Sequence, residues 1–207
     1  MNTQRSKGPI QSVERFTEGS ALTDLLPVLR SWSRQIGSQL HGHVSGQQPS
    51  WLSYSEAVAQ WADSARKIGW QAQVVTPKSG QPGWDILMDS PAGDRLFAVW
   101  AVGLKPSLAD GTASSLIEQG IGLARQNASG LRAGNGRARL VLALITPYLR
   151  SDESLTEDIS SVVDRWLTDL LSPIGRTASI FVLGASGDFS NAAGWHFPAV
   201  GVVATLV

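Results

Sequence analysis

The sequence predicts an α/β protein in which a mixed central sheet is flanked by helices on both faces. Helical periodicity gives way to strand-like alternation near residue 70 and then returns. In addition, "LVLALITPY" (140–148) and "ASIFVLG" (178–184) are apolar throughout, which is typical of strands covered on both faces. A content of 43% hydrophobic and 16% charged residues argues against disorder and for a packed core.

Charge and composition exclude several functional classes. Lys+Arg and Asp+Glu both number 17, so binding to nucleic acid would have to come from a local patch and not from a basic excess. The absence of cysteine excludes disulfides and cysteine-type zinc sites. The N-terminal "MNTQRSKGPIQSVER" lacks the apolar core of a secretory signal, and the last apolar run, 197–207, is too short for a membrane helix. We therefore expect a cytoplasmic protein with no membrane partner.

The first fifty residues are predicted to form a polar tail, a helix and a loop ahead of an α/β domain that spans residues 51–207. Residues 1–19 are polar and are expected to be frayed. From 21 to 40, leucines and other apolar residues recur at helical spacing, with Pro27 near the first turn. Residues 41–50 have the Gly, Gln, Pro and Ser content of a loop.

The domain is predicted to begin with a helix and three strands. Ser53 and Glu56 in "SYSE" have the spacing of a capping box, and Gly69 lies where that helix should end. Strand-like segments follow at 70–77, 84–89 and 95–105. The Pro and Gly of "SPAGD" predict a hairpin between the last two strands.

Helices and strands then alternate. We expect a helix at 113–127, a central strand at 140–148, a helix at 154–175 and a buried strand at 178–184. The apolar segment 197–207 closes the chain as an edge or added strand. This αβββαβαβ order predicts a mixed sheet rather than a doubly wound one, because three strands follow one another before the alternation starts.

That order, together with "PGWDIL" and "RLFAVWAVGLK", resembles the restriction-endonuclease-like fold of the PD-(D/E)XK nuclease superfamily, over roughly residues 53–184. In that family an aspartate opens the second strand and an acidic-x-lysine triplet lies on the third. Two carboxylates hold Mg²⁺, and the lysine positions and activates the attacking water. The resemblance implies a role in DNA processing or host defence, DNA as a partner, and Mg²⁺ as the cofactor of an active enzyme.

Asp85 matches the family's aspartate, because it follows Pro82 and Gly83 and precedes a strand. The alternative is an ordinary aspartate that caps a turn at a strand start. Lys105 is the candidate lysine of the triplet. The alternative for this residue is a lysine whose charged end reaches solvent where the strand leaves the core.

The acidic position of the triplet has no match in the third strand. A short hairpin would place the acidic residue and the lysine at Val99 and Ala101, and a shift of two pairs that restores Lys105 puts Gly103 at the acidic position. Some members of the superfamily carry the missing carboxylate on the following helix. Glu118, thirteen residues after Lys105, would then complete a rearranged degenerate site, with Asp85 and Glu118 as metal ligands; the alternative is a solvated helix residue.

Arginine and tryptophan side chains supply candidate contacts to a partner. Arginine forks suit phosphate oxygens, although a solvated loop explains the same charges; the candidates are Arg125, Arg132, Arg137 and Arg139. Trp84 and Trp195 lie in expected loops, where either would contact a partner or stack on a base. The helical positions of Trp32, Trp61 and Trp166 are typical of core residues.

Two functional hypotheses follow from the resemblance, and a third does without it. In the first, the protein is a non-catalytic or weakly active nuclease-like module that binds nucleic acid, a protein partner or a second copy of itself. In the second, it is a Mg²⁺-dependent DNA endonuclease that uses Asp85, Lys105 and Glu118. In the third, the chain is an α/β protein of another family, and Asp85 and Lys105 are ordinary surface residues.

Overall fold

The computed structural model describes residues 11–17, 20–42, 53–75, 83–134, 136–183 and 194–207. In these residues the helices and strands follow one another as β1 (Gln11–Phe16), α1 (Ser20–Thr23), α2 (Leu26–Gly42), α3 (Tyr54–Arg66), β2 (Gln71–Val74), β3 (Ile86–Asp89), β4 (Leu96–Leu104), α4 (Ala113–Ser129), β5 (Ala138–Ile145), β6 (Leu149–Arg150), α5 (Ile159–Ile174), β7 (Thr177–Leu183), β8 (Trp195–His196) and β9 (Ala199–Leu206).

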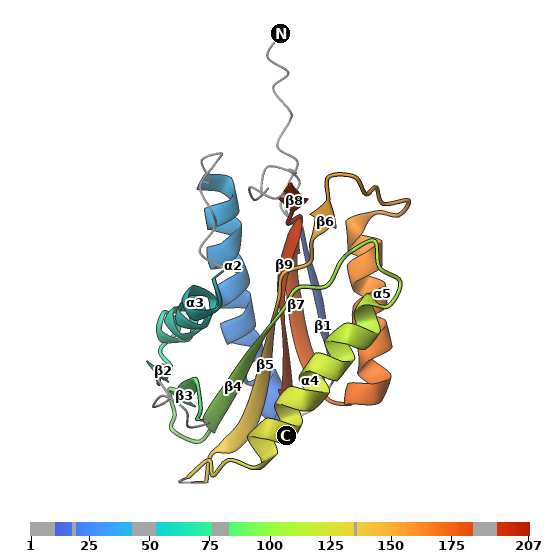
Figure 1. Cartoon of the computed structure of the whole chain (residues 1–207). Coiled ribbons are helices and arrows are strands. Elements are labelled where there is room, and N and C mark those ends of the chain that lie inside the picture. Colours follow the sequence, from blue (N-terminus) through green and yellow to red (C-terminus); the bar gives the residue numbers. More distant parts are fainter. Residues whose placement is uncertain (1–10, 18–19, 43–52, 76–82, 135, 184–193) are drawn as a thin grey trace.

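A seven-stranded sheet runs through the middle of the molecule in the order β1-β7-β9-β5-β4-β3-β2 (Figure 1). β4 and β5 are parallel, whereas every other neighbouring pair of this sheet is antiparallel. A parallel pair needs a long crossover connection, and α4 provides it. β6 and β8 form a separate two-stranded ladder.

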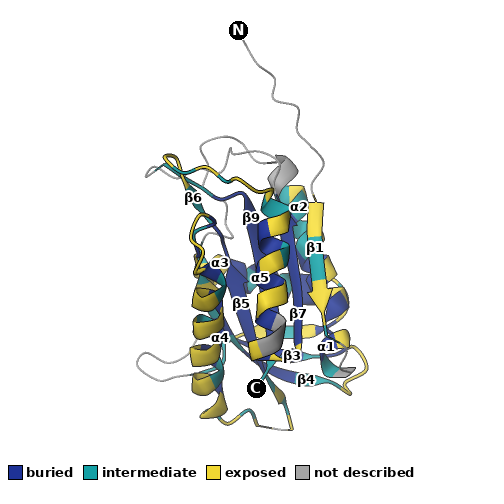
Figure 2. Ribbon diagram, turned by 90° about the vertical axis from the view of Figure 1, so that its right-hand side faces the viewer, coloured by how far each residue is buried: buried dark blue, intermediate teal, exposed yellow. Residues whose placement is uncertain are grey.

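Helices cover the sheet on both faces and enclose one hydrophobic core on each side (Figure 1). α1, α2 and α3 pack on the face that we call the α2–α3 face, and α4 and α5 pack on the opposite, α4–α5 face. The central strands are buried, and the outward sides of α4 and α5 are exposed (Figure 2). β4 shows the alternation directly: 97, 99 and 101 belong to the first core, and 100, 102 and 104 pack against the second.

The predicted fold class is therefore confirmed as a mixed α/β sheet with helices on both faces. The strand expected at 140–148 is central and buried from Leu140 onward. Trp32, Trp61 and Trp166 are core residues as predicted, since each is at most 3% exposed. The helix expected within the first fifty residues shares its core with the rest of the chain, because Trp32 lies in the same buried cluster as Trp61 and Ile180.

β1 lies within residues 1–19, which were expected to be frayed. β1 pairs antiparallel with β7, from Gln11 opposite Leu183 to Phe16 opposite Ala178. Its charged residues are anchored on both faces of the sheet: Glu14 accepts hydrogen bonds from Arg30 of α2, and Arg15 forms an ion pair with Asp164 of α5. Polar side chains thus belong to an edge strand here, which explains why the segment lacked an apolar strand pattern.

The closing strand is central, and the expectation of an edge or added strand was wrong. β9 lies between β7 and β5 and is antiparallel to both. Its residues from Ala199 to Thr205 are all buried. Apolar side chains on both faces are typical of a strand that is covered on both sides, and β9 has this composition as clearly as β5 does.

Two helix boundaries differ from prediction for local reasons. The helix expected at 21–40 is divided into α1 and α2 by a turn at residues 24–25, so that Pro27, which lacks an N–H donor, lies in the first turn of α2. The helix expected from residue 154 begins at Ile159, because Asp158 caps it by accepting a hydrogen bond from the Ser160 N–H at 3.1 Å. Among the described residues, no helix has both the length and the apolar character needed to cross a bilayer.

A polar seam fixes α3 against α2. The Ser31 hydroxyl donates to the Ser64 carbonyl at 2.9 Å, and the Ser64 hydroxyl lies 3.1 Å from Oε1 of Gln35. Lys67, just after α3, also donates to Gln35 Oε1 at 3.0 Å. Ser53 occupies the predicted N-cap position, although its side chain makes no capping hydrogen bond. The seam sets the position of α3, and with it that of the residue at its start, Tyr54.

One close approach in the sheet gives a stability test. Gly201 of β9 lies opposite Phe181 of β7, and a Cβ at Gly201 would be 2.4 Å from the buried phenyl ring. We expect Gly201→Ala to lower the free energy of unfolding by about 1–3 kcal/mol, as overpacking does. In a Phe181→Leu background the same substitution should cost less, and urea unfolding of the four proteins measures both costs. Equal costs in the two backgrounds would show that the ring is not responsible.

Candidate functional site

Asp85 ends the ladder between β3 and β4. Its backbone N–H donates to the Val99 carbonyl at 2.9 Å, and its Oδ2 accepts a hydrogen bond from the Ala101 N–H at 2.8 Å. β3 begins only at the next residue, Ile86. The Ala101 N–H of β4 therefore donates to the Asp85 carboxylate in place of a carbonyl of the neighbouring strand. This is a structural role at a strand start.

Tyr54, the first residue of α3, completes the surroundings of this carboxylate. Its hydroxyl lies 3.1 Å from Asp85 Oδ1 and 3.1 Å from the Ala101 carbonyl oxygen. Its ring lies over Gly103, because a Cβ at that glycine would be 3.4 Å from Tyr54 Cδ2. The side chain is nevertheless 45% exposed. Tyr54 is a site residue that the sequence did not predict, since "SYSE" indicated only the start of a helix.

Burial governs the titration of this pair. It raises the pKa of the Asp85 carboxyl above 3.8, while the hydrogen bonds from Ala101 and Tyr54 act in the opposite direction. Burial also raises the pKa of the Tyr54 hydroxyl above 10.0, and the charge of Asp85 adds to that increase. Tyr54 therefore remains a hydrogen-bond donor, and a cation at Asp85 would have to compete with internal donors to both carboxylate oxygens.

Lys105 follows β4 directly and is exposed. By the alternation of β4 it belongs with Val99, Ala101 and Gly103 on the α2–α3 face, which is the face from which Tyr54 approaches. Among the described residues, neither a hydrogen bond nor an ion pair is found for its ammonium group. The lysine is therefore available to a ligand at this end of the sheet.

Glu118 belongs to a helix on the other face of the sheet from the helix whose Tyr54 contacts Asp85. It is an exposed residue of α4, whose buried side packs on the α4–α5 face. The two proposed metal ligands thus come from opposite faces of the sheet. In the part of the chain that the structure describes, no group of three or more His, Asp or Glu side chains could hold a metal ion. A single carboxylate that already accepts two hydrogen bonds does not suit Mg²⁺, which prefers several oxygen ligands.

Three of the four candidate arginines serve as internal anchors through their guanidinium groups, whereas Arg132 contributes only its backbone carbonyl. Arg137 forms an ion pair with Asp89 and also donates to the Met88 carbonyl at 3.1 Å. Arg125 donates to the Ile174 carbonyl and Arg139 to the Ser129 carbonyl, and the Arg132 carbonyl accepts the Trp84 indole N–H; the distances are 3.2, 3.1 and 3.0 Å in that order.

Two of the arginines also lie far from Lys105. Arg137 and Arg139 flank the start of β5, whereas Lys105 follows the end of β4. Because the strands are parallel and paired from Phe97 to Leu104, about 23 Å of sheet separates these positions. The structure therefore does not place Arg137 and Arg139 in one patch with Lys105.

Aromatic side chains instead gather near Lys105. Tyr148 and Trp195 stack with ring centroids 4.4 Å apart and an interplanar angle of 14°. Both rings are partly buried against the core of the α2–α3 face. Tyr148 pairs with Ser107, just beyond Lys105, and its N–H donates to the Pro106 carbonyl at 3.0 Å. The Tyr148–Trp195 pair, Lys105 and Tyr54 thus share one face and one end of the sheet.

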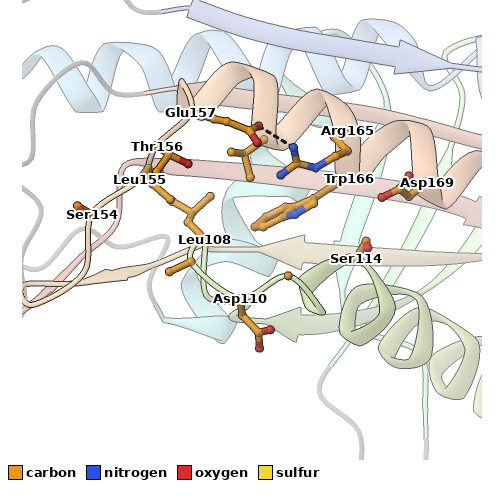
Figure 3. A pocket seen from close by; sticks show the side chains of 13 residues that line it. Leu108, Asp110, Ser114, Ser154, Leu155, Thr156, Glu157, Arg165, Trp166 and Asp169 are labelled. Carbon is orange, nitrogen blue, oxygen red and sulfur yellow. Dashed lines mark hydrogen bonds and ion pairs between the residues drawn. The ribbon is translucent and has the colours of Figure 1, made fainter.

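A separate hollow of about 200 Å³ lies on the α4–α5 face (Figure 3). Some of its charged side chains are already paired: Glu157 accepts from Arg165 at 2.6 Å, and Asp110 accepts from the N–H and hydroxyl of the neighbouring Thr112, both at 2.8 Å. Those hydrogen bonds lower the pKa of Asp110. Trp166 forms part of the wall.

Comparison of the chain with protein-family models, with curated proteins and with solved structures finds no match. The function must therefore be inferred from the side chains at the two ends of the sheet and on its two faces.

The structural role of Asp85 predicts how its variants will unfold. Asp85→Ala leaves the Ala101 N–H without its acceptor, so we expect a loss of about 1–3 kcal/mol in the free energy of unfolding. Asp85→Asn can still accept from Ala101 through its amide oxygen and should lose less. Urea unfolding at neutral pH measures both. A loss in Asp85→Asn as large as in Asp85→Ala would contradict the proposed hydrogen bonding.

The pH dependence of stability distinguishes the charged carboxylate from the neutral amide. Because the folded-state pKa of Asp85 is raised, its protonated form contributes stability that is fully present below 3.8 and is lost as pH rises through the folded value. The Asp85→Asn variant does not lose this stability. Its free energy of unfolding relative to that of the native protein should therefore increase as the pH rises from 3.8 through the folded-state pKa of Asp85. The quantity to measure is the difference in the free energy of unfolding between the two proteins at each pH. This difference cancels the contributions of Asp94, Asp110 and Asp158, whose pKa values are lowered and which therefore affect stability in the opposite sense.

Proposed function

We propose that the protein is a restriction-endonuclease-like module that binds nucleic acid without hydrolysing it. The observation that carries the proposal is the state of Asp85. Its carboxylate accepts hydrogen bonds from the Ala101 N–H and the Tyr54 hydroxyl, and so acts as part of the sheet. A nuclease would need that carboxylate, together with a second one, to hold Mg²⁺.

The arrangement of elements supports the nuclease-like half of this proposal. α3, β2, β3, β4, α4 and β5 follow one another in the order that suggested the resemblance. β2, β3 and β4 are consecutive antiparallel neighbours, and β5 is parallel to β4 across the helix α4. Asp85 stands at the start of the second of these strands and Lys105 at the end of the third. The resemblance implies an aspartate at the first of these positions, whereas its lysine would fall at Ala101 in the short-hairpin register, and Lys105 lies two pairs further along the same face.

The loss of catalysis follows from the side chains on the α2–α3 face of β4. Val99 and Ala101 are buried in the apolar core, and Gly103 has no side chain. None of the three can ligate Mg²⁺. Glu118 belongs to a helix on the other face. The chain therefore has an aspartate at the family's position and a lysine further along the third strand, and β4 itself carries no carboxylate.

Nucleic acid is the partner that best fits the surface around Lys105. An exposed ammonium group attracts phosphate, and the neighbouring aromatic rings can contact bases or sugars. A protein partner would be expected to meet a larger apolar surface. Here the exposed tyrosine and the partly buried aromatic pair surround a free charge.

The affinity for nucleic acid should fall only weakly as the salt concentration rises, and Lys105 should account for part of that fall. One phosphate contact contributes roughly 0.7–0.9 to the slope of log affinity against log salt. Lys105→Ala should therefore reduce the slope by about that amount. Arg176→Ala makes the same change of charge at an exposed residue directly before β7, at the opposite end of the sheet, and should leave it unchanged. Fluorescence anisotropy with labelled oligonucleotides, single-stranded and duplex, measures the slope; equal effects of the two variants would refute the role of Lys105.

The absence of hydrolysis is tested in parallel. Incubation of the protein with plasmid or single-stranded DNA and Mg²⁺ should leave the DNA intact. Mg²⁺-dependent cleavage that is lost in Asp85→Asn and in Lys105→Ala, but kept in Arg176→Ala, would overturn the non-catalytic proposal and identify an active nuclease. Failure to bind any nucleic acid would overturn the binding proposal.

A further inference from the structure

We propose that the ligand of this site is single-stranded nucleic acid, bound by stacking of unpaired bases on Tyr54 and on the Tyr148–Trp195 pair. This inference rests on the proposed function and specifies its ligand. It is carried by the juxtaposition of two fixed aromatic surfaces with one free lysine on one face and at one end of the sheet.

Tyr54 is a preorganised stacking surface. Its hydroxyl is held by Asp85 Oδ1 and the Ala101 carbonyl, and one side of its ring lies against Gly103. The helix that carries it is fixed to α2 by the seam around Ser64 and Gln35. A 45% exposed ring held in this way loses little conformational freedom when a base stacks on it.

The Tyr148–Trp195 pair forms the second surface. Two backbone contacts hold Tyr148 beside the chain that leaves β4: its N–H donates to the Pro106 carbonyl, and its carbonyl accepts from the Leu108 N–H at 2.8 Å. Trp195 is held in β8, opposite Arg150 of β6. The two rings are therefore positioned by backbone pairing rather than by side-chain packing alone.

The two surfaces are separated by a distance that a short stretch of single strand can span. Tyr54 lies over Gly103, and Tyr148 is the bridge partner of Ser107. Four residues of extended chain cover about 13 Å, and Lys105 is the midpoint of this segment. A backbone phosphate between two stacked bases would thus come near the free ammonium group.

Charge favours a single strand over a duplex. Affinity for duplex DNA comes largely from contacts with many phosphates, whereas stacking on an aromatic ring needs a base whose face is free. The chain has a net charge of +0, and Arg150, the basic residue next to Trp195, is paired with Glu153 at 3.0 Å. Among the described residues between the two aromatic surfaces, Lys105 is thus the cation without a partner. Unpaired bases are the feature that this surface can recognise.

The test compares four fluorescein-labelled probes of equal length by anisotropy: oligothymidylate, oligouridylate, an A·T duplex, and a deoxyribose-phosphate chain with abasic sites. We expect the single strands to bind at least tenfold more tightly than the duplex and the abasic chain. The two single strands also distinguish DNA from RNA as the source of the unpaired bases.

Variants assign the effect to the aromatic surfaces. Tyr54→Ala and Trp195→Ala should each weaken binding of the preferred single strand by about tenfold, the contribution of one stacked base. Tyr54→Phe keeps the ring and should lose less than Tyr54→Ala. Arg176→Ala, at the opposite end of the sheet, serves as the control outside the site. Circular dichroism and thermal unfolding of each variant confirm that the fold is retained, and Tyr54→Phe still tests the site should an alanine variant unfold.

Each outcome has one meaning. Tighter binding of duplex than of single strands, equal binding of the abasic chain, or alanine variants that bind like the native protein would overturn the stacking inference and leave nucleic-acid binding in place. Absence of binding to all four probes would overturn the proposed function itself.

Discussion

The parallel pairing of β4 with β5 is the constraint on which the rest of the molecule depends. It runs without interruption from Phe97 opposite Ala138 to Leu104 opposite Ile145. Because the two strands are parallel, the chain leaves both of them at the same end of the sheet. Lys105 and Tyr148 therefore emerge as neighbours, and the bridge from Ser107 to Tyr148 continues the pairing beyond the strands. The connection α4 must then lie on one face, which leaves the other face to α3 and Tyr54.

The strongly periodic parts of the chain could be predicted, and the pairing of distant strands could not. β4, α4 and β5 have patterns that local physics dictates, so their positions agree closely with expectation. β1 has no such pattern, because Glu14 and Arg15 are stabilised by ion pairs with residues of α2 and α5 that only the folded sheet brings near. β9 had the apolar composition of a central strand, but no local signal specifies which strands lie beside it.

The candidate site was predictable in part for the same reason. Asp85 and Lys105 were recognisable from their places at the ends of two strands. The thirteen-residue spacing of Glu118 gave its distance along the chain and not the face of the sheet on which its helix packs. Tyr54 was missed because its role arises from tertiary contacts with Asp85 and Gly103. The arginines after α4 looked like a surface patch, yet backbone carbonyls and Asp89 occupy most of their guanidinium groups.

Gly103 has a consequence for how such a module could change during evolution. The ring of Tyr54 lies over the bare backbone of this glycine, at the position where the nuclease resemblance would place an acidic residue. A Cβ at this position would be in ordinary contact with the ring, at 3.4 Å, so a carboxylate that extended toward the ring would have to share its space. In the proposed module, a metal-binding carboxylate and aromatic recognition would therefore compete for the same small volume above one residue, and a lineage that gained one at this position would be expected to give up the other.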